Sequence, residues 1–202
     1  MKTEVDDARR RLHAMNASLP MCLHVIRDVR GEEPLRLIQA WAGVRSHYRR
    51  GWSLALVGVG TGQTAAWART ARQFAVADSL RLMPTVTRKD AAVLVSAADV
   101  LICPDGEGQP DPFTLDAMRQ GTPALIGDDD ATRGALRDAA WFVDPQDTAA
   151  LSRSLARLLS DPLLRRELGQ AGALRATSLG DASRADARDG RADPESPVAR
   201  AA

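Results

Sequence analysis

The chain has 202 residues, of which 45% are hydrophobic and 26% are charged, and its formal net charge at pH 7 is +1. This length suits one α/β domain with a tail, and a charge so near zero gives no field that would attract nucleic acid, so we expect no nucleic-acid partner. Cys22 and Cys103 lie in apolar runs without the spacing of a metal site or a disulfide framework. Such cysteines are typical of reduced thiols in a cytoplasmic protein, and we expect no metal site.

The N-terminal residues and the longest apolar runs indicate whether the sequence contains a signal peptide or a membrane span. The first twenty residues contain Asp6, Asp7 and Arg9 but not the apolar core of a signal peptide. No later run approaches the ~18 apolar residues that a membrane span needs. We therefore expect no transmembrane segment and a cytoplasmic location.

Apolar runs and helical periodicity alternate after a lead-in segment at residues 1–19. The pattern predicts strands at Met21–Ile26, Trp52–Val57, Ser79–Met83, Val100–Cys103, Pro123–Ile126 and Trp141–Val143. It predicts helices at Glu32–Tyr48, Thr64–Phe74, Asp90–Ala97, Thr114–Gln120, Ala131–Ala139, Thr148–Leu159 and Leu163–Leu174. This alternation indicates a doubly wound parallel sheet, a Rossmann-like α/β fold, over residues 20–176. Apolar periodicity ends near residue 177, so we expect residues 177–202 to be a disordered tail.

A polar loop joins the predicted strand Val100–Cys103 to the helix that begins at Thr114. In an open parallel sheet, ligands bind where loops leave the carboxyl ends of strands, and a helix N-terminus offers N–H groups to anions. Glu107, Asp111 and Asp116 stand at this position. Carboxylates accept hydrogen bonds from the hydroxyls of a sugar or a ribose. The alternative is an acidic turn exposed to solvent.

Two arginines, Arg27 and Arg30, follow the first predicted strand and could reach the same edge of the sheet. Two cations there would bind a diphosphate, although isolated arginines are often surface charges. The glycines after the second strand, at positions 58, 60 and 62, have the spacing G-x-G-x-G. A dinucleotide-binding fingerprint has the spacing G-x-G-x-x-G and an acid at the end of the next strand, so NAD is not the expected ligand.

Other polar clusters give weaker signals. The run Asp128–Asp130 is interpreted as a solvated loop, since the sequence places no further cation ligand beside it. The three histidines have no recognisable nucleophile motif near them. His24 lies inside a predicted strand, where we expect a packed imidazole.

Five segments in order carry a resemblance to a known family. They are His24-Val25-Ile26-Arg27 followed by Arg30-Gly31, Leu54 to Gly60, Ala97-Ala98-Asp99-Val100 with Pro104, Leu115-Asp116-Ala117-Met118 with Gly121 and Pro123, and WFVDPQDTAALSRSLARLLSDPLLRRELGQAG. Over roughly residues 8–176 the chain resembles the C-terminal, donor-binding half of a retaining GT-B glycosyltransferase. The family includes glycogen and sucrose synthases.

The resemblance implies a role for each matching position. Arg27 and Arg30 would bind the donor diphosphate and stabilise the leaving group, and Asp116 would hold the ribose. The backbone near Thr85 and Val86 would meet the base. The loop at Glu107 would hold the transferred sugar, and we expect the remaining lining of the nucleotide-sugar site to come from Gly58, Gly60, Gly108 and Asp111. The resemblance implies a nucleoside diphosphate sugar as donor, with no metal and no other cofactor.

The match departs from the family pattern in the acidic loop. The family's two glutamates stand eight residues apart, whereas Glu107 is nine residues and Asp111 five residues before Asp116. Either Glu107 or Asp111 could therefore replace the first glutamate. The chain also begins where the second domain of such an enzyme would begin. We expect an incomplete glycosyltransferase that is inactive without a separate acceptor-binding domain or subunit. The alternatives are a non-catalytic nucleotide or nucleotide-sugar binding module and half of a sugar-nucleotide epimerase.

Overall fold

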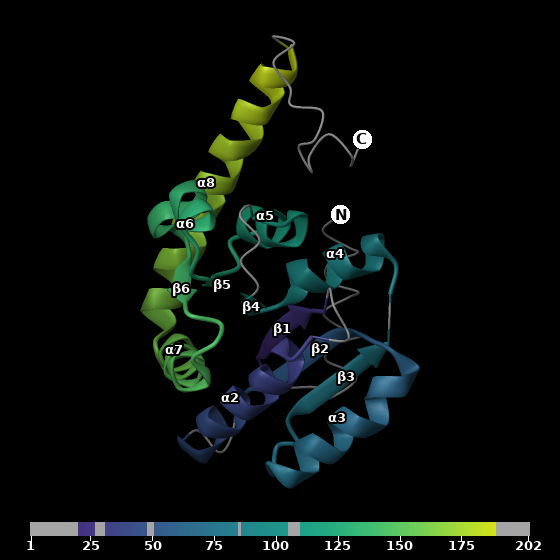
Figure 1. Ribbon diagram of the computed structural model, residues 1–202. Coiled ribbons are helices and arrows are strands. Elements are labelled where there is room, and N and C mark those ends of the chain that lie inside the picture. Colours follow the sequence, from purple (N-terminus) through teal and green to yellow (C-terminus); the bar gives the residue numbers. More distant parts are fainter. Residues whose placement is uncertain (1–19, 27–30, 48–50, 85, 105–109, 189–202) are drawn as a thin grey trace.

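The computed structural model describes residues 20–26, 31–47, 51–84, 86–104 and 110–188 (Figure 1). Its strands are β1 (Met21–Val25), β2 (Ser53–Val59), β3 (Leu80–Pro84), β4 (Val100–Cys103), β5 (Ala124–Gly127) and β6 (Trp141–Val143). Its helices are α2 (Glu33–His47), α3 (Thr61–Gln73), α4 (Arg88–Ala97), α5 (Pro112–Arg119), α6 (Asp130–Leu136), α7 (Thr148–Ser160) and α8 (Pro162–Arg188), with a 3₁₀ turn, η1, at Arg137–Ala139. The strands form a parallel sheet in the order β3-β2-β1-β4-β5-β6, which confirms the predicted doubly wound fold.

Helices cover both faces of this sheet, which explains why its strands are apolar throughout. In β2, Leu54 and Leu56 pack with buried side chains of α2, α3 and α7. The intervening Ala55 and Val57 pack with α4 and α5 on the other face. Successive side chains of a strand point to opposite faces, so a strand buried on both sides has no polar alternation. The core therefore lies in two layers, one on each side of the sheet.

The sheet changes its direction of winding between β1 and β4. The chain passes from β1 to β2 and β3 on one side, and from β4 to β5 and β6 on the other. β1 pairs with β2 over five residues, Met21 to Val25. It pairs with β4 only at Cys22↔Val100 and Leu23↔Leu101. The backbone ladder between the two central strands thus ends before either strand does. The crevice at the carboxyl ends of the strands, where the winding changes direction, is where ligands bind in open α/β sheets.

The last helix is longer than the sequence indicated. α8 has 27 residues and continues to Arg188, so the predictions of a helix end at Leu174 and of a disordered tail from residue 177 are wrong over residues 177–188. The Arg175 guanidinium donates a hydrogen bond to the carbonyl of Ala135, at 2.6 Å, and Leu179 packs against the core. These contacts anchor the helix, and alanine and arginine continue it without an apolar stripe. Residues 189–202 lie outside the described residues.

Smaller differences occur at other boundaries. α3 begins at Thr61 rather than Thr64, because Gly60 is the N-cap and its carbonyl accepts hydrogen bonds from the N–H groups of Gln63 and Thr64. The helix predicted at Ala131–Ala139 divides into α6 and η1 at Arg137, which has a φ of 53°. Within the described residues, none of the helices is long and apolar enough to cross a membrane.

Candidate functional site

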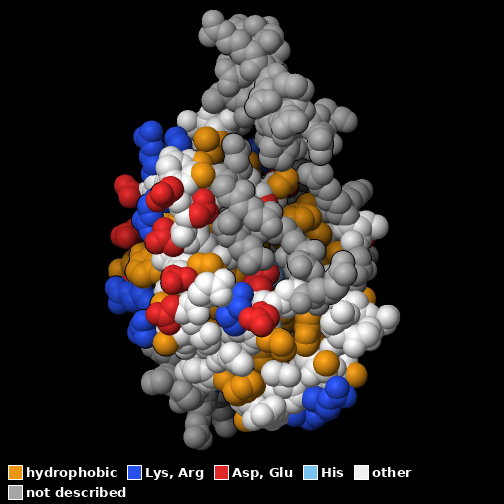
Figure 2. Space-filling model, in the orientation of Figure 1, with side chains coloured by type: hydrophobic (Ala, Val, Ile, Leu, Met, Phe, Trp, Pro, Cys, Tyr) orange, Lys and Arg blue, Asp and Glu red, His pale blue; other side chains and the backbone are white. Residues whose placement is uncertain are grey.

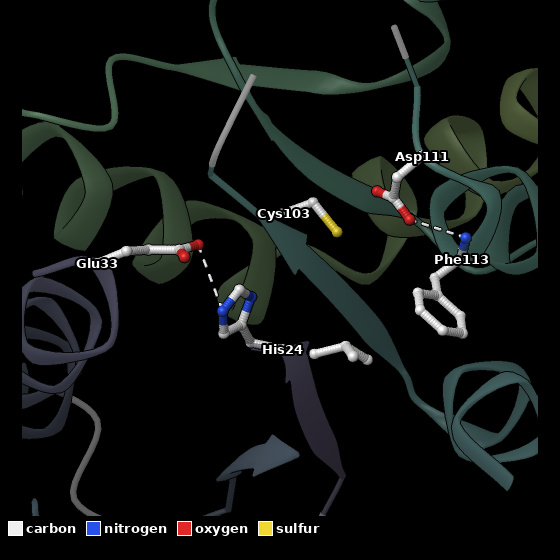
Figure 3. A pocket seen from close by; sticks show the side chains of 6 residues that line it. His24, Glu33, Cys103, Asp111 and Phe113 are labelled. Atoms are coloured by element: carbon white, nitrogen blue, oxygen red, sulfur yellow. Dashed lines mark hydrogen bonds and ion pairs between the residues drawn. The ribbon is translucent and has the colours of Figure 1, made fainter. Parts of the chain in front are cut away.

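The crevice at the carboxyl ends of β1 and β4 contains a small pocket (Figure 3). Its lining consists of His24, Val25, Glu33, Cys103, Asp111 and Phe113. These residues come from the ends of the two central strands and from the first turns of α2 and α5. A concave site with a few converging polar groups at a topological switch point is the usual ligand site of this architecture. We therefore take this pocket as the centre of the candidate functional site.

One side of the pocket is made by a buried pair, His24 and Glu33, whose side chains are directed toward each other in Figure 3. His24 is 2% exposed and Glu33 is 6% exposed. The imidazole Nδ1 lies 2.8 Å from the carbonyl oxygen of Ile102, so Nδ1 carries a hydrogen, because a carbonyl can only accept. Nε2 lies 3.3 Å from Oε1 of Glu33. The prediction of a packed imidazole at His24 is confirmed.

Glu33 is a residue of the site that the sequence did not reveal. It stands in the first turn of α2, where a carboxylate favours the positive end of the helix dipole. The signal in the sequence was the acid pair before Pro34, which also fits a helix start exposed to solvent. Only the fold shows that Glu33 is turned inward, toward a histidine on β1.

The other side of the pocket is made by Asp111, which is the N-cap of α5. Its Oδ1 accepts hydrogen bonds from the backbone N–H groups of Phe113 and Thr114, at 2.8 and 3.1 Å. Its Oδ2 accepts from the Thr114 hydroxyl at 2.5 Å. Pro112 occupies the first helical turn, as is common after such a cap. The carboxylate predicted to meet the donor is thus already a helix cap, with one face turned to the pocket.

Asp116 lies one turn further along α5. Its Oδ1 accepts a hydrogen bond from Arg119 at 2.9 Å, and the two side chains are each 41% exposed. Asp116 does not line the pocket. A carboxylate with an oxygen left for another donor can still accept a hydroxyl hydrogen, so the pair with Arg119 is compatible with ribose binding.

The glycine turn after β2 approaches the end of β1. Gly58 has a φ of +100°, a region that favours glycine, and a Cβ atom there would lie 3.1 Å from the carbonyl oxygen of Ile26. Gly60 gives the N-terminus of α3 no side-chain cap. Val86 follows β3 and is partly buried against the core. These three predicted residues all stand at the carboxyl edge of the sheet.

The remaining predicted site residues, Arg27, Arg30, Thr85, Glu107 and Gly108, lie outside the described residues. Two of the segments that contain these residues connect described elements. Residues 27–30 connect Ile26, after β1, to Gly31, before α2. Residues 105–109 connect Pro104, after β4, to Pro110, before α5.

Asp128 and Asp129, in the acidic run at 128–130, form hydrogen bonds with residues of α6. Arg133 donates to both carboxylate oxygens of Asp128, at 2.7 and 2.5 Å, and this contact lowers the pKa of Asp128. Asp129 caps α6, and its hydrogen bonds with Thr132 lower its pKa. Among the residues that the structure describes, no cluster of three histidine, cysteine or acidic side chains could hold a metal ion. On the face shown in Figure 2, acidic and basic side chains are intermixed beside α6 and α7.

The chain is similar to several known proteins. It is 34% identical over 102 residues to D-inositol 3-phosphate glycosyltransferase from Salinispora arenicola, a match that covers 50% of this chain and 23% of that protein. The C-terminal domain of LpcC, a glycosyl transferase group 1 family protein from Francisella tularensis, superposes with a TM-score of 0.65 at 17% identity, covering 84% of this chain and 91% of that one.

A third similar protein is HepE from Anabaena, solved in complex with UDP-glucose. The two structures superpose with a TM-score of 0.70 at 14% identity, and the match covers 88% of this chain and 49% of HepE. The chain thus spans about a quarter of the curated relative and about half of HepE. Residues 6–175 match the sequence profile of the Glycosyl transferases group 1 family. The chain belongs to the Glycosyl transferases group 1 family.

Proposed function

We propose that the described sheet is the donor-binding domain of a retaining glycosyltransferase whose donor is a nucleoside diphosphate sugar. The observation that carries the proposal is the pocket between the ends of β1 and β4 in a chain of this family. Two likenesses of fold support it: the isolated C-terminal domain of LpcC is covered almost entirely, and HepE was solved with UDP-glucose.

The proposed roles of the side chains follow from charge and from position along the chain. Arg27 and Arg30 would bind the diphosphate and stabilise the charge that develops on it as the sugar leaves. Because two guanidinium groups can supply this charge, the proposal includes no metal and no other cofactor. Asp116 would accept a hydrogen bond from the ribose, and the loop containing Glu107 and Gly108 would face the sugar.

The base would lie at the edge formed by the loops after β2 and β3. Gly58 lets the first of these loops approach the end of β1, and Gly60 belongs to the same loop. Thr85 and Val86 belong to the second. Asp111 would contribute mainly by fixing the N-terminus of α5 beside the sugar, since its carboxylate accepts three hydrogen bonds from its own helix.

Transfer requires that an acceptor be held in near-attack geometry against the donor. We propose that a separate domain or subunit supplies the acceptor site. The 202-residue chain alone should then hydrolyse its donor slowly at most. NMR of the anomer released first, before it equilibrates, would test retention. The proposal includes a cytoplasmic location, because Cys22 and Cys103 lie in apolar runs without the spacing of a disulfide framework.

Calorimetric titration with UDP, GDP and ADP, with and without EDTA, tests the donor site. We expect weak binding that EDTA leaves unchanged. Each charge-assisted hydrogen bond is worth roughly 1.5–3 kcal/mol, so Arg27→Ala should weaken binding about 10- to 100-fold and Asp116→Asn somewhat less. Arg153→Ala is the matched control, because Arg153 is an exposed arginine on α7. If no nucleotide binds at millimolar concentration, or if Arg27→Ala binds as tightly as the parent, the donor-site assignment fails.

A second candidate is a nucleotide-binding module without transferase chemistry. The commitment of Asp111 to capping α5 favours it, since one of the two acids that could replace the family's first glutamate already has a structural role. Titration with sugar conjugates separates the candidates. A transferase domain should bind the conjugate and release its sugar slowly, whereas a binding module should return it intact.

A further inference from the structure

A side chain on β1 bonds to β4 at the point where the backbone pairing between these two strands ends. The last backbone pair of these strands is Leu23↔Leu101. At the next position His24 places its Nδ1 2.8 Å from the carbonyl oxygen of Ile102. The imidazole therefore donates the hydrogen bond that holds the strands together as the crevice opens. β2 continues to pair with β1 through Val25. Beyond Leu23, the described contacts therefore include the ladder on the β2 side of β1 and this ring on the β4 side.

The same ring also contacts the helix that follows β1. His24 lies two residues after Cys22, so both side chains face the side of the sheet covered by α2. There Nε2 lies 3.3 Å from Oε1 of Glu33, in the first turn of α2. One imidazole thus links three structural elements at the base of the pocket: the end of β1, the end of β4 and the start of α2 (Figure 3).

We infer that His24, with Glu33 as its partner, is a positioning residue for nucleotide-donor binding, which it serves by fixing the width of the crevice between β1 and β4. This inference rests on the proposed donor site. The pair itself need not touch the donor. A misplacement of about 1 Å in a positioned group can cost on the order of 10²-fold in activity, so a ring that sets the spacing of two strand ends can control affinity.

Because His24 and Glu33 are buried, removing either side chain should cost free energy. Leaving a buried polar group without its partner costs more than the bond contributes, because the group is already removed from water. Replacing His24 by phenylalanine keeps a ring but removes the hydrogen-bond donor to the buried Ile102 carbonyl and the imidazole beside Glu33. Water entering to hydrogen-bond that carbonyl would widen the crevice. Replacing Glu33 by glutamine keeps a polar partner, because an amide can accept from a protonated Nε2 through its oxygen and donate to an unprotonated Nε2 through its N–H.

The test compares nucleotide affinity with stability in four variants. His24→Phe should weaken binding of UDP, GDP or ADP about tenfold, the equivalent of one lost hydrogen bond, and Glu33→Ala should do the same. Glu33→Gln should stay within about threefold of the parent. Val44→Ala is the control: it removes buried volume from the same helix, 2% exposed, eleven residues from Glu33. It should lower the melting temperature and leave affinity unchanged.

Hydrogen exchange adds a readout that needs no nucleotide. Amides of Val25 and Cys103 should exchange faster in His24→Phe than in Val44→Ala. The inference is overturned if His24→Phe binds like the parent, if affinity falls in Val44→Ala as much as in His24→Phe, or if exchange at these amides is unchanged. A parent protein that binds none of the three nucleotides would instead overturn the proposed donor site, and the exchange result would still decide whether His24 holds the strands.

Discussion

The contact between Gly169 and Gly121 offers a sharp test of how α8 packs on the domain. A Cβ atom added at Gly169 would lie 2.2 Å from the carbonyl oxygen of Gly121 and 3.1 Å from its carbonyl carbon. Both are backbone atoms, so no side chain can turn away. Gly121 itself has a φ of +78° and ends the turn after α5. Gly169→Ala therefore forces α8 and this turn apart by close to 1 Å, since carbon and oxygen rarely approach within about 3.2 Å without a bond.

The expected magnitude is a balance of two terms. Alanine in a helix gains about 1 kcal/mol over glycine, and overpacking of a tight contact costs typically about 1–3 kcal/mol, occasionally more. Here the overlap is with backbone on an anchored helix, so the cost should exceed the gain. We expect Gly169→Ala to lose about 1–2 kcal/mol of unfolding free energy, or roughly 2–8 °C in melting temperature for a chain of this size.

Two glycines elsewhere are matched controls. Gly134, in α6, has nothing within 4 Å of an added Cβ, so Gly134→Ala should stabilise by about 0.5–1 kcal/mol. Gly172, on the same helix as Gly169, would meet its neighbours at an ordinary 3.5 Å, so Gly172→Ala should also stabilise by about 0.5–1 kcal/mol. Urea unfolding of the three variants measures their unfolding free energies and so ranks their stabilities. The packing of α8 on the α5 turn would be refuted if Gly169→Ala were as stable as Gly134→Ala.

Two further predictions concern carboxylates that cap helices. Asp111→Ala should lower the unfolding free energy by about 1 kcal/mol in urea unfolding, whereas Asp111→Asn should lower it little, because asparagine caps a helix equally well. Asp111→Asn should also bind nucleotide as the parent does. Weaker binding by Asp111→Asn without a loss of stability would show that the donor needs the charge. Asp129 has a lowered pKa in the folded protein, so the unfolded chain binds more protons in acid and stability is lost as pH falls below about 4. Asp129→Asn should lose less stability than the parent between pH 6 and pH 3, and an unchanged loss would contradict this.

The fold was largely predictable because strand and helix patterns alternate strictly. The stretch Val100–Cys103 was placed correctly as a strand, since a short apolar run between turn residues has few other structures. The end of α8 was not predictable, because Arg175 finds its partner at Ala135, 40 residues earlier in the chain. Contacts of this kind depend on the finished fold and leave no periodic trace in the sequence.

The edge of the sheet at which the candidate pocket lies could be predicted from the sequence, but the lining of the pocket could not. Motif order placed it at the carboxyl edge of β1 and β4, where the pocket lies. Spacing could not distinguish a carboxylate that meets a ligand from one that caps a helix, and Asp111 caps α5. His24 was expected to be buried, but its partner Glu33 could be found only from the packing of α2 on β1.

The central claim is that a nucleoside diphosphate binds in the crevice between β1 and β4. The most direct measurement is NMR mapping of backbone amides during titration with UDP, GDP and ADP. We expect the largest shifts at Val25, Cys103 and Phe113, around the pocket, and small shifts at Ser53 and Val100, at the opposite ends of their strands. Shifts that cluster at those opposite ends, or on α7 and α8 away from the crevice, would contradict the account.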